Sequence, residues 1–357
     1  MPAVAKEGAR FVTADAVARE ARVSRSTVSR AFTPGASVSP EARTRVMATA
    51  AAMGYRVNRL AQSLIRARSH LVGLVGSNLA TPFHGSQVAA LSEAMFAAGM
   101  QCLLLNADAK GADGSGADGS GADVAPLIET LLELRARAVV ILSGTPPTAI
   151  VGECRRSGLS VVLINKPLPA LAAHTILCDD VAGAGLAAER LLAAGCRRLA
   201  VIGSASGTAS ITRRIDAFRA RIAERGLPCL VWSEGPTGYE TGLQAARGLL
   251  GARPGSTETG SPEIDGAFCA TDLIAMGFMD GARHERGWRI PQEVSVVGFD
   301  DIPQAGWLAY GLTTLRQSVP HLVDAVMAAL ADDAEPLPGA LPVVLPVTLV
   351  ERGSVRA

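Results

Sequence analysis

Arginine and serine cluster in a short segment near the amino end of the chain, at Arg25, Ser26, Ser29 and Arg30. Residues three and four apart share one face of a helix, so a helix here would gather these side chains into one polar surface. An arginine can donate two parallel hydrogen bonds to O6 and N7 of guanine, and a serine can contact base edges or phosphate oxygens. Because the surface lacks an apolar stripe, the pattern predicts contact with nucleic acid rather than packing on another domain.

Three short helices are expected to position that surface. Thr13 can cap the first, at about residues 14–21, and Ser24 can cap the second, at about residues 25–32. Pro40 begins the third, since proline suits the first helical position. Two short helices joined by a tight turn form a helix-turn-helix, which places the first turn of its second helix in the major groove of DNA. A plain three-helix bundle is the alternative.

Charge is distributed unevenly along the 357 residues, although the net charge is only +1. Residues 1–70 contain twelve Lys and Arg against four Asp and Glu, a net charge of +8, and the remainder carries −7. A basic end on an acidic body favours a polyanionic partner for that end, against the alternative of a solvated basic surface. Hydrophobic residues make up 48% of the chain and charged residues 19%, which excludes an intrinsically disordered protein.

From residue 70 onward, short apolar runs alternate with helical stretches. Strands are expected at residues 71–75, 101–105, 138–142, 160–164, 199–202, 229–232, 267–270 and 295–298. Helices are expected at residues 86–98, 125–134, 149–156, 181–194, 210–224, 239–250, 273–286 and 319–330. Repeated strand–helix units predict parallel sheets with helices on both faces, in two lobes that bind a ligand at the carboxyl ends of their strands.

Residues 12–64 resemble the head and hinge of the lactose-repressor (LacI/GalR) family of transcriptional regulators. The resemblance is carried by V-T-A-D-A-V-A-R-E-A-R-V-S-R-S-T-V-S-R, V-S-P-E-A-R-T-R-V and G-Y-R-V-N-R-L-A-Q-S-L. Later segments, such as F-C-A-T-D-L-I-A-M-G and P-Q-E-V-S-V-V-G-F-D-D, resemble the effector domain of that family. The implied fold is a small all-α helix-turn-helix head and an α/β two-lobed, periplasmic-binding-protein-like (type I) effector domain with parallel sheets.

The resemblance also implies roles for individual residues of the head. The base-reading positions are Arg25, Ser26 and Arg30, and the phosphate-contacting or capping positions are Thr13, Ser24, Ser29 and Asn58. Leu64 stands where the hinge leucine of the family enters the minor groove and kinks the duplex. An ordinary linker helix, with its leucines packed on the next domain, is the alternative.

Two residues of the head depart from the family pattern. Arg22 replaces the turn glycine that is usual in the family, so the turn must form without the conformational freedom of glycine. Val57 replaces a usual proline before Asn58, which loosens the entry to the hinge.

The effector site implied by the resemblance draws on both lobes. Its residues are Asn78, Phe83, Arg214, Thr271, Asp272, Asp300 and Gln317. Thr271 stands where the family usually has asparagine, and Asn165 where aspartate is common, so a simple hexose is not singled out among sugar-like effectors. For each of these residues a hinge or surface role is the alternative.

The same resemblance sets the expected domain boundaries. A DNA-binding domain spans residues 1–57, a hinge 58–69 and an effector-binding and dimerisation domain 70–357. Within the last, the first lobe takes about residues 70–166 and 318–346, and the second takes 167–317 and 347–357. The chain is expected to cross between lobes near residues 166–168, 314–318 and 345–347. A homodimer on a pseudo-palindromic operator is expected, because each head recognises a half-site.

Other residue patterns point to no catalytic or metal chemistry. The cysteines and histidines form no metal-binding or triad pattern, so neither catalytic residues nor cofactors are expected. Residues 111–123 match a dinucleotide-binding glycine pattern, but their aspartates would repel a pyrophosphate, which favours a loop. No long apolar run or signal sequence is found, so a cytoplasmic protein is expected. A transporter's solute-binding protein or an α/β enzyme explains the body but leaves the basic head without a role.

Overall fold

The computed structural model describes residues 12–33, 35–56, 69–107, 124–166, 168, 172–205, 207–251, 264–331, 336 and 338–357. The chain forms two compact units, Met1–Ser69 and His70–Ala357. Val57, Asn58, Leu64 and the 111–123 repeat lie outside the described residues, so what the sequence predicts for them stays a prediction. No described helix is long and apolar enough to cross a lipid bilayer.

The first unit contains the three predicted helices, each beginning at its predicted cap. They are α1 (Ala14–Glu20), α2 (Arg25–Ala31) and α3 (Pro40–Ala52). The hydroxyl of Thr13 accepts the N–H of Ala16 at 3.2 Å, and that of Ser24 accepts the N–H of Thr27 at 3.1 Å. Val17, Val28 and Val46, one from each helix, are fully buried and form the centre of the core.

The turn between α1 and α2 keeps its shape without glycine. Arg22 adopts the left-handed conformation, with a φ of 54°, and the N–H of Val23 then donates to the carbonyl of Ala18 at 2.9 Å. The end of α3 repeats the arrangement with Gly54 at a φ of 67° and the N–H of Tyr55 donating back into the helix at 2.8 Å. Both ends follow the Schellman pattern, in which glycine is favoured at the left-handed residue.

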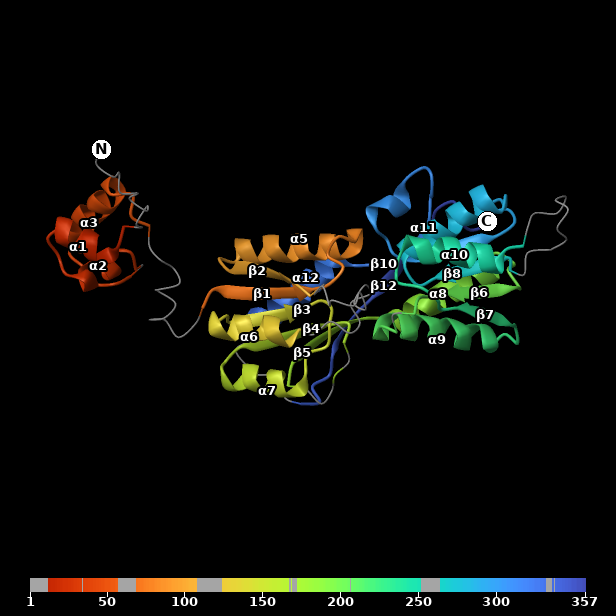
Figure 1. Ribbon diagram of the computed structural model, residues 1–357, viewed down its shortest axis with the longest axis horizontal. Coiled ribbons are helices and arrows are strands. Elements are labelled where there is room, and N and C mark those ends of the chain that lie inside the picture. Colours follow the sequence, from red (N-terminus) through yellow and green to blue (C-terminus); the bar gives the residue numbers. More distant parts are fainter. Residues whose placement is uncertain are drawn as a thin grey trace, which may run out of the picture. The chain divides into compact units, whose positions relative to one another are not determined.

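Two six-stranded sheets build the second unit, one in each lobe (Figure 1). The first sheet has the order β11-β5-β4-β3-β1-β2 and is parallel throughout. Its strands are β1 (Leu71–Gly76), β2 (Gln101–Asn106), β3 (Ala138–Ile141), β4 (Ser160–Ile164), β5 (His174–Cys178) and β11 (Val343–Leu345). The second has the order β12-β10-β9-β8-β6-β7, with β12 antiparallel to β10. Its strands are β6 (Leu199–Ile202), β7 (Cys229–Trp232), β8 (Gly266–Cys269), β9 (Ser295–Asp300), β10 (Thr313–Gln317) and β12 (Val347–Val350).

Helices cover both faces of each sheet, as the alternating pattern predicts. On the first sheet, one face carries α5 (Pro82–Ala97) and α12 (Val319–Ala331), and the other carries α6 (Ala125–Glu133) and α7 (Thr148–Arg156). On the second sheet, α8 (Asp180–Ala193) and α9 (Ala209–Ala223) lie opposite α10 (Tyr239–Leu249) and α11 (Asp272–Asp280). The sequence predicts one α-helix over residues 273–286, but α11 ends at Asp280 and a short π-helix, Gly281–Glu285, follows it. A 3-10 helix spans Pro303–Gly306.

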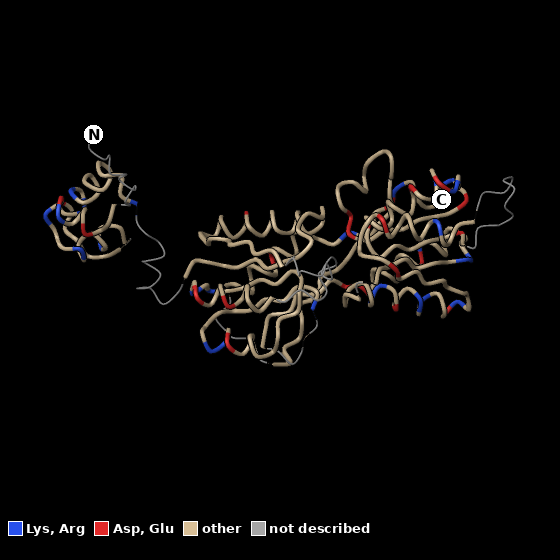
Figure 2. Tube along the Cα trace, viewed as in Figure 1, with Lys and Arg blue, Asp and Glu red and all other residues tan. Residues whose placement is uncertain are grey.

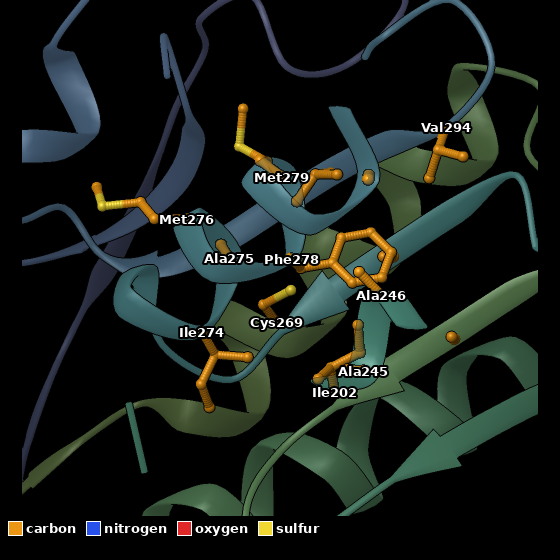
Figure 3. Packing of buried hydrophobic residues seen from close by; sticks show 14 of the residues in the cluster. Ile202, Ala245, Ala246, Cys269, Ile274, Ala275, Met276, Phe278, Met279 and Val294 are labelled. Carbon is orange, nitrogen blue, oxygen red and sulfur yellow. The ribbon is translucent and has the colours of Figure 1, made fainter. Parts of the chain in front are cut away.

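Glycines allow α10 and α11 to pack at unusually short distance. A Cβ atom at Gly277 would lie 1.9 Å from the carbonyl oxygen of Tyr239, and one at Gly242 would lie 2.0 Å from that of Ile274. The contact buries the apolar side chains of α11 in the core of the second lobe, where Phe278 lies beside the alanines of α10 (Figure 3).

The first crossing between the lobes differs from the prediction. Because β5 pairs with β4 in the first sheet, the chain crosses between Cys178 and Asp180, and the position predicted from the sequence, residues 166–168, is wrong. The sequence H-T-I-L-C of β5 is short and follows a segment rich in proline and alanine, so its strand pattern is weak. The other two crossings lie between β10 and α12 and between β11 and β12.

Candidate nucleic-acid interface and ligand cavity

The polar face of α2 is open to solvent. Arg25, Ser26, Ser29 and Arg30 are all exposed, together with the capping residue Ser24. The guanidinium of Arg25 lies 3.8 Å from the carboxylate of Asp15, but both side chains are more than 60% exposed, so this pair holds the arginine weakly. The structure therefore brings together the predicted base-reading residues at the amino end of one helix.

Other arginines of the first unit are held by the fold. Arg43 donates to the carbonyls of Ala31 at 2.6 Å and Ala36 at 3.1 Å, and Arg45 donates to the carbonyl of Ala21 at 2.9 Å. The bonds to Ala21 and Ala31 satisfy carbonyls at the carboxyl ends of α1 and α2, which the helices leave without partners. The blue positions on the three helices in Figure 2 are arginines, and the exposed ones on α2, Arg25 and Arg30, remain available to a polyanion.

A cavity of about 430 Å³ lies at the carboxyl ends of strands from both sheets. Asn78 follows β1, Asn165 and Lys166 follow β4, and Thr271 follows β8. The amino end of α9 also lines it, through residues 207–211. The size and position are those expected of a small-molecule site in an α/β protein.

Six of the seven predicted effector residues line this cavity. They are Asn78, Phe83, Arg214, Thr271, Asp300 and Gln317. Asn78 and Asp300 have positive φ values of 52° and 126°, and such strain in side-chain-bearing residues is common where a ligand is bound.

Arg214 is the centre of a buried charge network. Its Nε donates to Asp180 at 2.8 Å, and its Nη1 donates to the carbonyl of Ala270 at 2.7 Å. The same Nη1 lies 3.5 Å from Asp300, and the guanidinium carbon stands 3.6 Å above the ring of Phe299. The protein thus fixes and compensates the guanidinium before any ligand arrives.

Asp300 is held from a second side by Gln317, whose Nε2 donates to its Oδ1 at 2.7 Å. Burial raises the pKa of Asp300 to about 8, while the charge of Arg214 acts in the opposite direction. The carboxyl, the amide and the guanidinium therefore present a row of fixed hydrogen-bonding groups to the cavity.

Asp272 does not line the cavity, which corrects its placement among effector-binding residues. It is fully buried, accepts the N–H of Ile302 at 2.9 Å and accepts the hydroxyl of Thr314 at 2.5 Å. Burial raises its pKa to about 6. Asp272 thus fastens α11 to the ends of β9 and β10, while its neighbour Thr271 faces the cavity and caps the helix.

Two charged residues of this region, Asp180 and Lys166, were not predicted from the sequence. Asp180 is fully buried and binds both Arg213, at 2.6 Å, and Arg214. The pair Asp179-Asp180 at the start of a predicted helix gave a partial signal, because only Asp179 is needed as its cap. Lys166 lines the cavity directly after the Asn165 position and carried no pattern of its own.

Among the residues that the structure describes, the other candidate groups do not gather into a second site. Cys154, Cys178, Cys196 and Cys269 are buried, in line with their interpretation as small apolar residues. Within the described ranges, His, Cys, Asp and Glu do not gather in groups of three that could hold a metal ion.

Two family models match the chain. Residues 13–58 match the model of bacterial regulatory proteins of the lacI family, and residues 188–355 match that of a periplasmic binding protein-like domain. The HTH-type transcriptional regulator GalR of Escherichia coli (strain K12) is 29% identical over 343 residues, covering 95% of this chain and 94% of that protein.

Solved structures repeat the same architecture. The lac repressor dimer bound to operator and the anti-inducer ONPF aligns over 98% of this chain and 100% of its own, with a TM-score of 0.78 and 22% identity. A complex of the transcriptional regulator CelR with cellobiose aligns over 96% of this chain and 99% of its own, with a TM-score of 0.64 and 26% identity. The predicted fold class is therefore confirmed.

Proposed function

We propose that the chain is a member of the lacI family of bacterial regulatory proteins, that it represses transcription by binding an operator, and that binding of a small molecule weakens or strengthens its binding to DNA. The observation that carries the proposal is the exposed polar face of α2 in a unit separate from the two-lobed one. A solute-binding protein would have no use for this face. We assign the protein no enzymatic activity, and its work on DNA implies a cytoplasmic location.

At the operator, Arg25, Ser26 and Arg30 read base edges in the major groove. Thr13, Ser24, Ser29 and Asn58 contact phosphates or cap helices, and Leu64 enters the minor groove. Support comes from the open amino end of α2, where helix N–H groups and arginines favour phosphate oxygens. Each head covers one half-site, so the active form is a homodimer on a pseudo-palindromic sequence.

The effector is a small, carbohydrate-like molecule held in the cavity by the six lining residues Asn78, Phe83, Arg214, Thr271, Asp300 and Gln317. A ligand that contacts both lobes favours the arrangement in which those contacts are made together. Since the chain passes between the lobes three times, a change in their closure reaches the start of the first lobe, to which the head is joined.

A gel-shift assay on the fragment of DNA upstream of the gene tests the proposal. The wild-type chain should bind a specific fragment with strong salt dependence. Arg30→Ala should weaken specific binding by about 1–3 kcal/mol, whereas Arg156→Ala, on an exposed end of α7 in the other unit, should not. Equal losses for the two variants, or no salt-sensitive binding to any genomic fragment, would contradict the proposal.

A further inference from the structure

Lys166 stands apart among the charged residues of the chain. The sequence contains three lysines, Lys6, Lys110 and Lys166, against 31 arginines, and Lys166 is the lysine that falls within the described residues. It lies two residues beyond the end of β4 and lines the cavity. The residue before it, Asn165, is left-handed with a φ of 57° and accepts the N–H of Cys178 at 2.7 Å, which fixes the backbone where Lys166 begins.

The ammonium group of Lys166 has no acidic partner in the described part of the chain. Arg214, the arginine of the lining, pairs with Asp180, which also pairs with Arg213. Among the residues that the structure describes, none forms an ion pair with Lys166. Burial lowers the pKa of Lys166, and no described carboxylate offsets that lowering. A partly buried ammonium without a counter-charge favours binding of an anion.

The amino end of α9 contributes a second positive region to the same cavity. Residues 207–211 line it, and α9 extends for 15 residues from there. The capping residue Thr208 makes no side-chain hydrogen bond to the helix, so the first N–H groups of α9 keep their capacity to donate. Asp300 is the one acidic residue among the described residues of the lining, and Arg214 and Gln317 already hold it.

We propose that the effector is a polyhydroxylated molecule with an anionic group, a carboxylate or a phosphate, and that Lys166 binds this group. The inference rests on the proposed function, since it names the class of effector for the same cavity. The neutral lining residues Asn78, Thr271 and Gln317 then hydrogen-bond the hydroxyl groups. Lysine suits the role because a compact point charge accepts either anion without the fixed geometry of a guanidinium.

Thermal-shift titrations of the full chain with matched pairs of probes test this. The pairs are glucose with gluconate and glucuronate, galactose with galacturonate, and glucose and ribose with their terminal phosphates, with inorganic phosphate as a further anion. At least one anionic probe should raise the melting temperature saturably, with its neutral partner weaker by about tenfold in affinity. The carboxylate and phosphate arms show which anion the cavity takes.

Two variants locate the effect at Lys166. Lys166→Met, of similar length but neutral, should abolish the preference for the anionic probe, and Lys166→Arg should keep most of it. Circular dichroism checks that both variants fold. Methylation of the three lysines with carbon-13 gives a direct readout by NMR. The methyl signal that is absent from Lys166→Arg belongs to Lys166, and its chemical shift should change when the anion binds.

Three results would overturn the inference: equal shifts from neutral and anionic probes, an anion effect that survives in Lys166→Met, or no response of the wild-type chain to any anionic probe. Operator binding by the ligand-free wild-type chain is measured by gel shift on the same preparation. If the chain binds operator DNA but shows no preference for anionic probes, the proposed function is retained and the proposal of an anionic effector is rejected. If no DNA is bound, the proposed function itself fails.

Discussion

Arg22 allows the strain in the turn before α2 to be measured. With a φ of 54° it occupies a conformation that costs a residue with a side chain about 1–2 kcal/mol. Arg22→Gly removes that cost, while the greater freedom of glycine in the unfolded chain offsets about 0.4–1 kcal/mol of the gain. Because Arg22 is exposed, few packing contacts are lost. We therefore expect the free energy of unfolding of the first unit to rise by roughly 1 kcal/mol.

Hydrogen exchange on the full chain reads this unit separately, because the amides of α1, α2 and α3 report its own opening. A gain of 1 kcal/mol should slow their exchange about fivefold. Gly54→Ala is the matched reversal, since Gly54 has a φ of 67° in the same motif, and it should speed exchange. Arg22→Lys keeps both charge and strain and should change little. Unchanged or faster exchange in Arg22→Gly would refute the reasoning.

The second unit offers two further predictions. Gly277→Ala places a Cβ atom against the Tyr239 carbonyl and should lower the melting temperature sharply. Gly185→Ala in α8 has open space around the added Cβ atom and should raise the melting temperature. Similar shifts for the two variants would contradict the close packing of α10 and α11. Burial raises the pKa of Asp300 to about 8, so the folded carboxyl keeps a proton that the unfolded one loses near pH 4. The stability that the protonated carboxyl contributes at low pH is lost as the pH rises to about 8. Asp300→Asn should therefore make the melting temperature depend less on pH between about 4 and 8. An unchanged pH dependence of the melting temperature would contradict this prediction.

Local sequence signals were sufficient for most of the fold. Thr13, Ser24 and Pro40 mark helix starts because capping and proline geometry act within one turn of helix. The continuously apolar strands β1, β3 and β6 were also predicted, since each is buried on both faces. The strand His174–Cys178 was missed because its burial comes from pairing with β4 and β11, and these partners are distant in the sequence or unmarked by pattern.

The candidate site was predicted only in part, for the same reason. The resemblance supplied Arg214 and Asp300, and the structure places both at the cavity. It also supplied Asp272, whose burial under β9 and β10 depends on contacts 30 and 42 residues away in the chain. Asp180 joins Arg214 from 34 residues away. Contacts between residues so distant in the chain are determined by tertiary packing, so the spacing of residues in one sequence does not predict them.

The two lobes contribute unequal charges to the cavity, and this links the anion to operator control. On the second lobe Arg214 is already paired with Asp180, while on the first lobe Lys166 has no ion pair in the described part of the chain. A ligand favours closure only through contacts that it makes in the closed arrangement and lacks in the open one. An anion held by Lys166 and by the amino end of α9 makes such contacts, because these groups belong to different lobes. A neutral sugar can favour closure of the lobes only through hydrogen bonds. The charge on an anionic effector therefore adds to the coupling free energy between effector binding and operator binding.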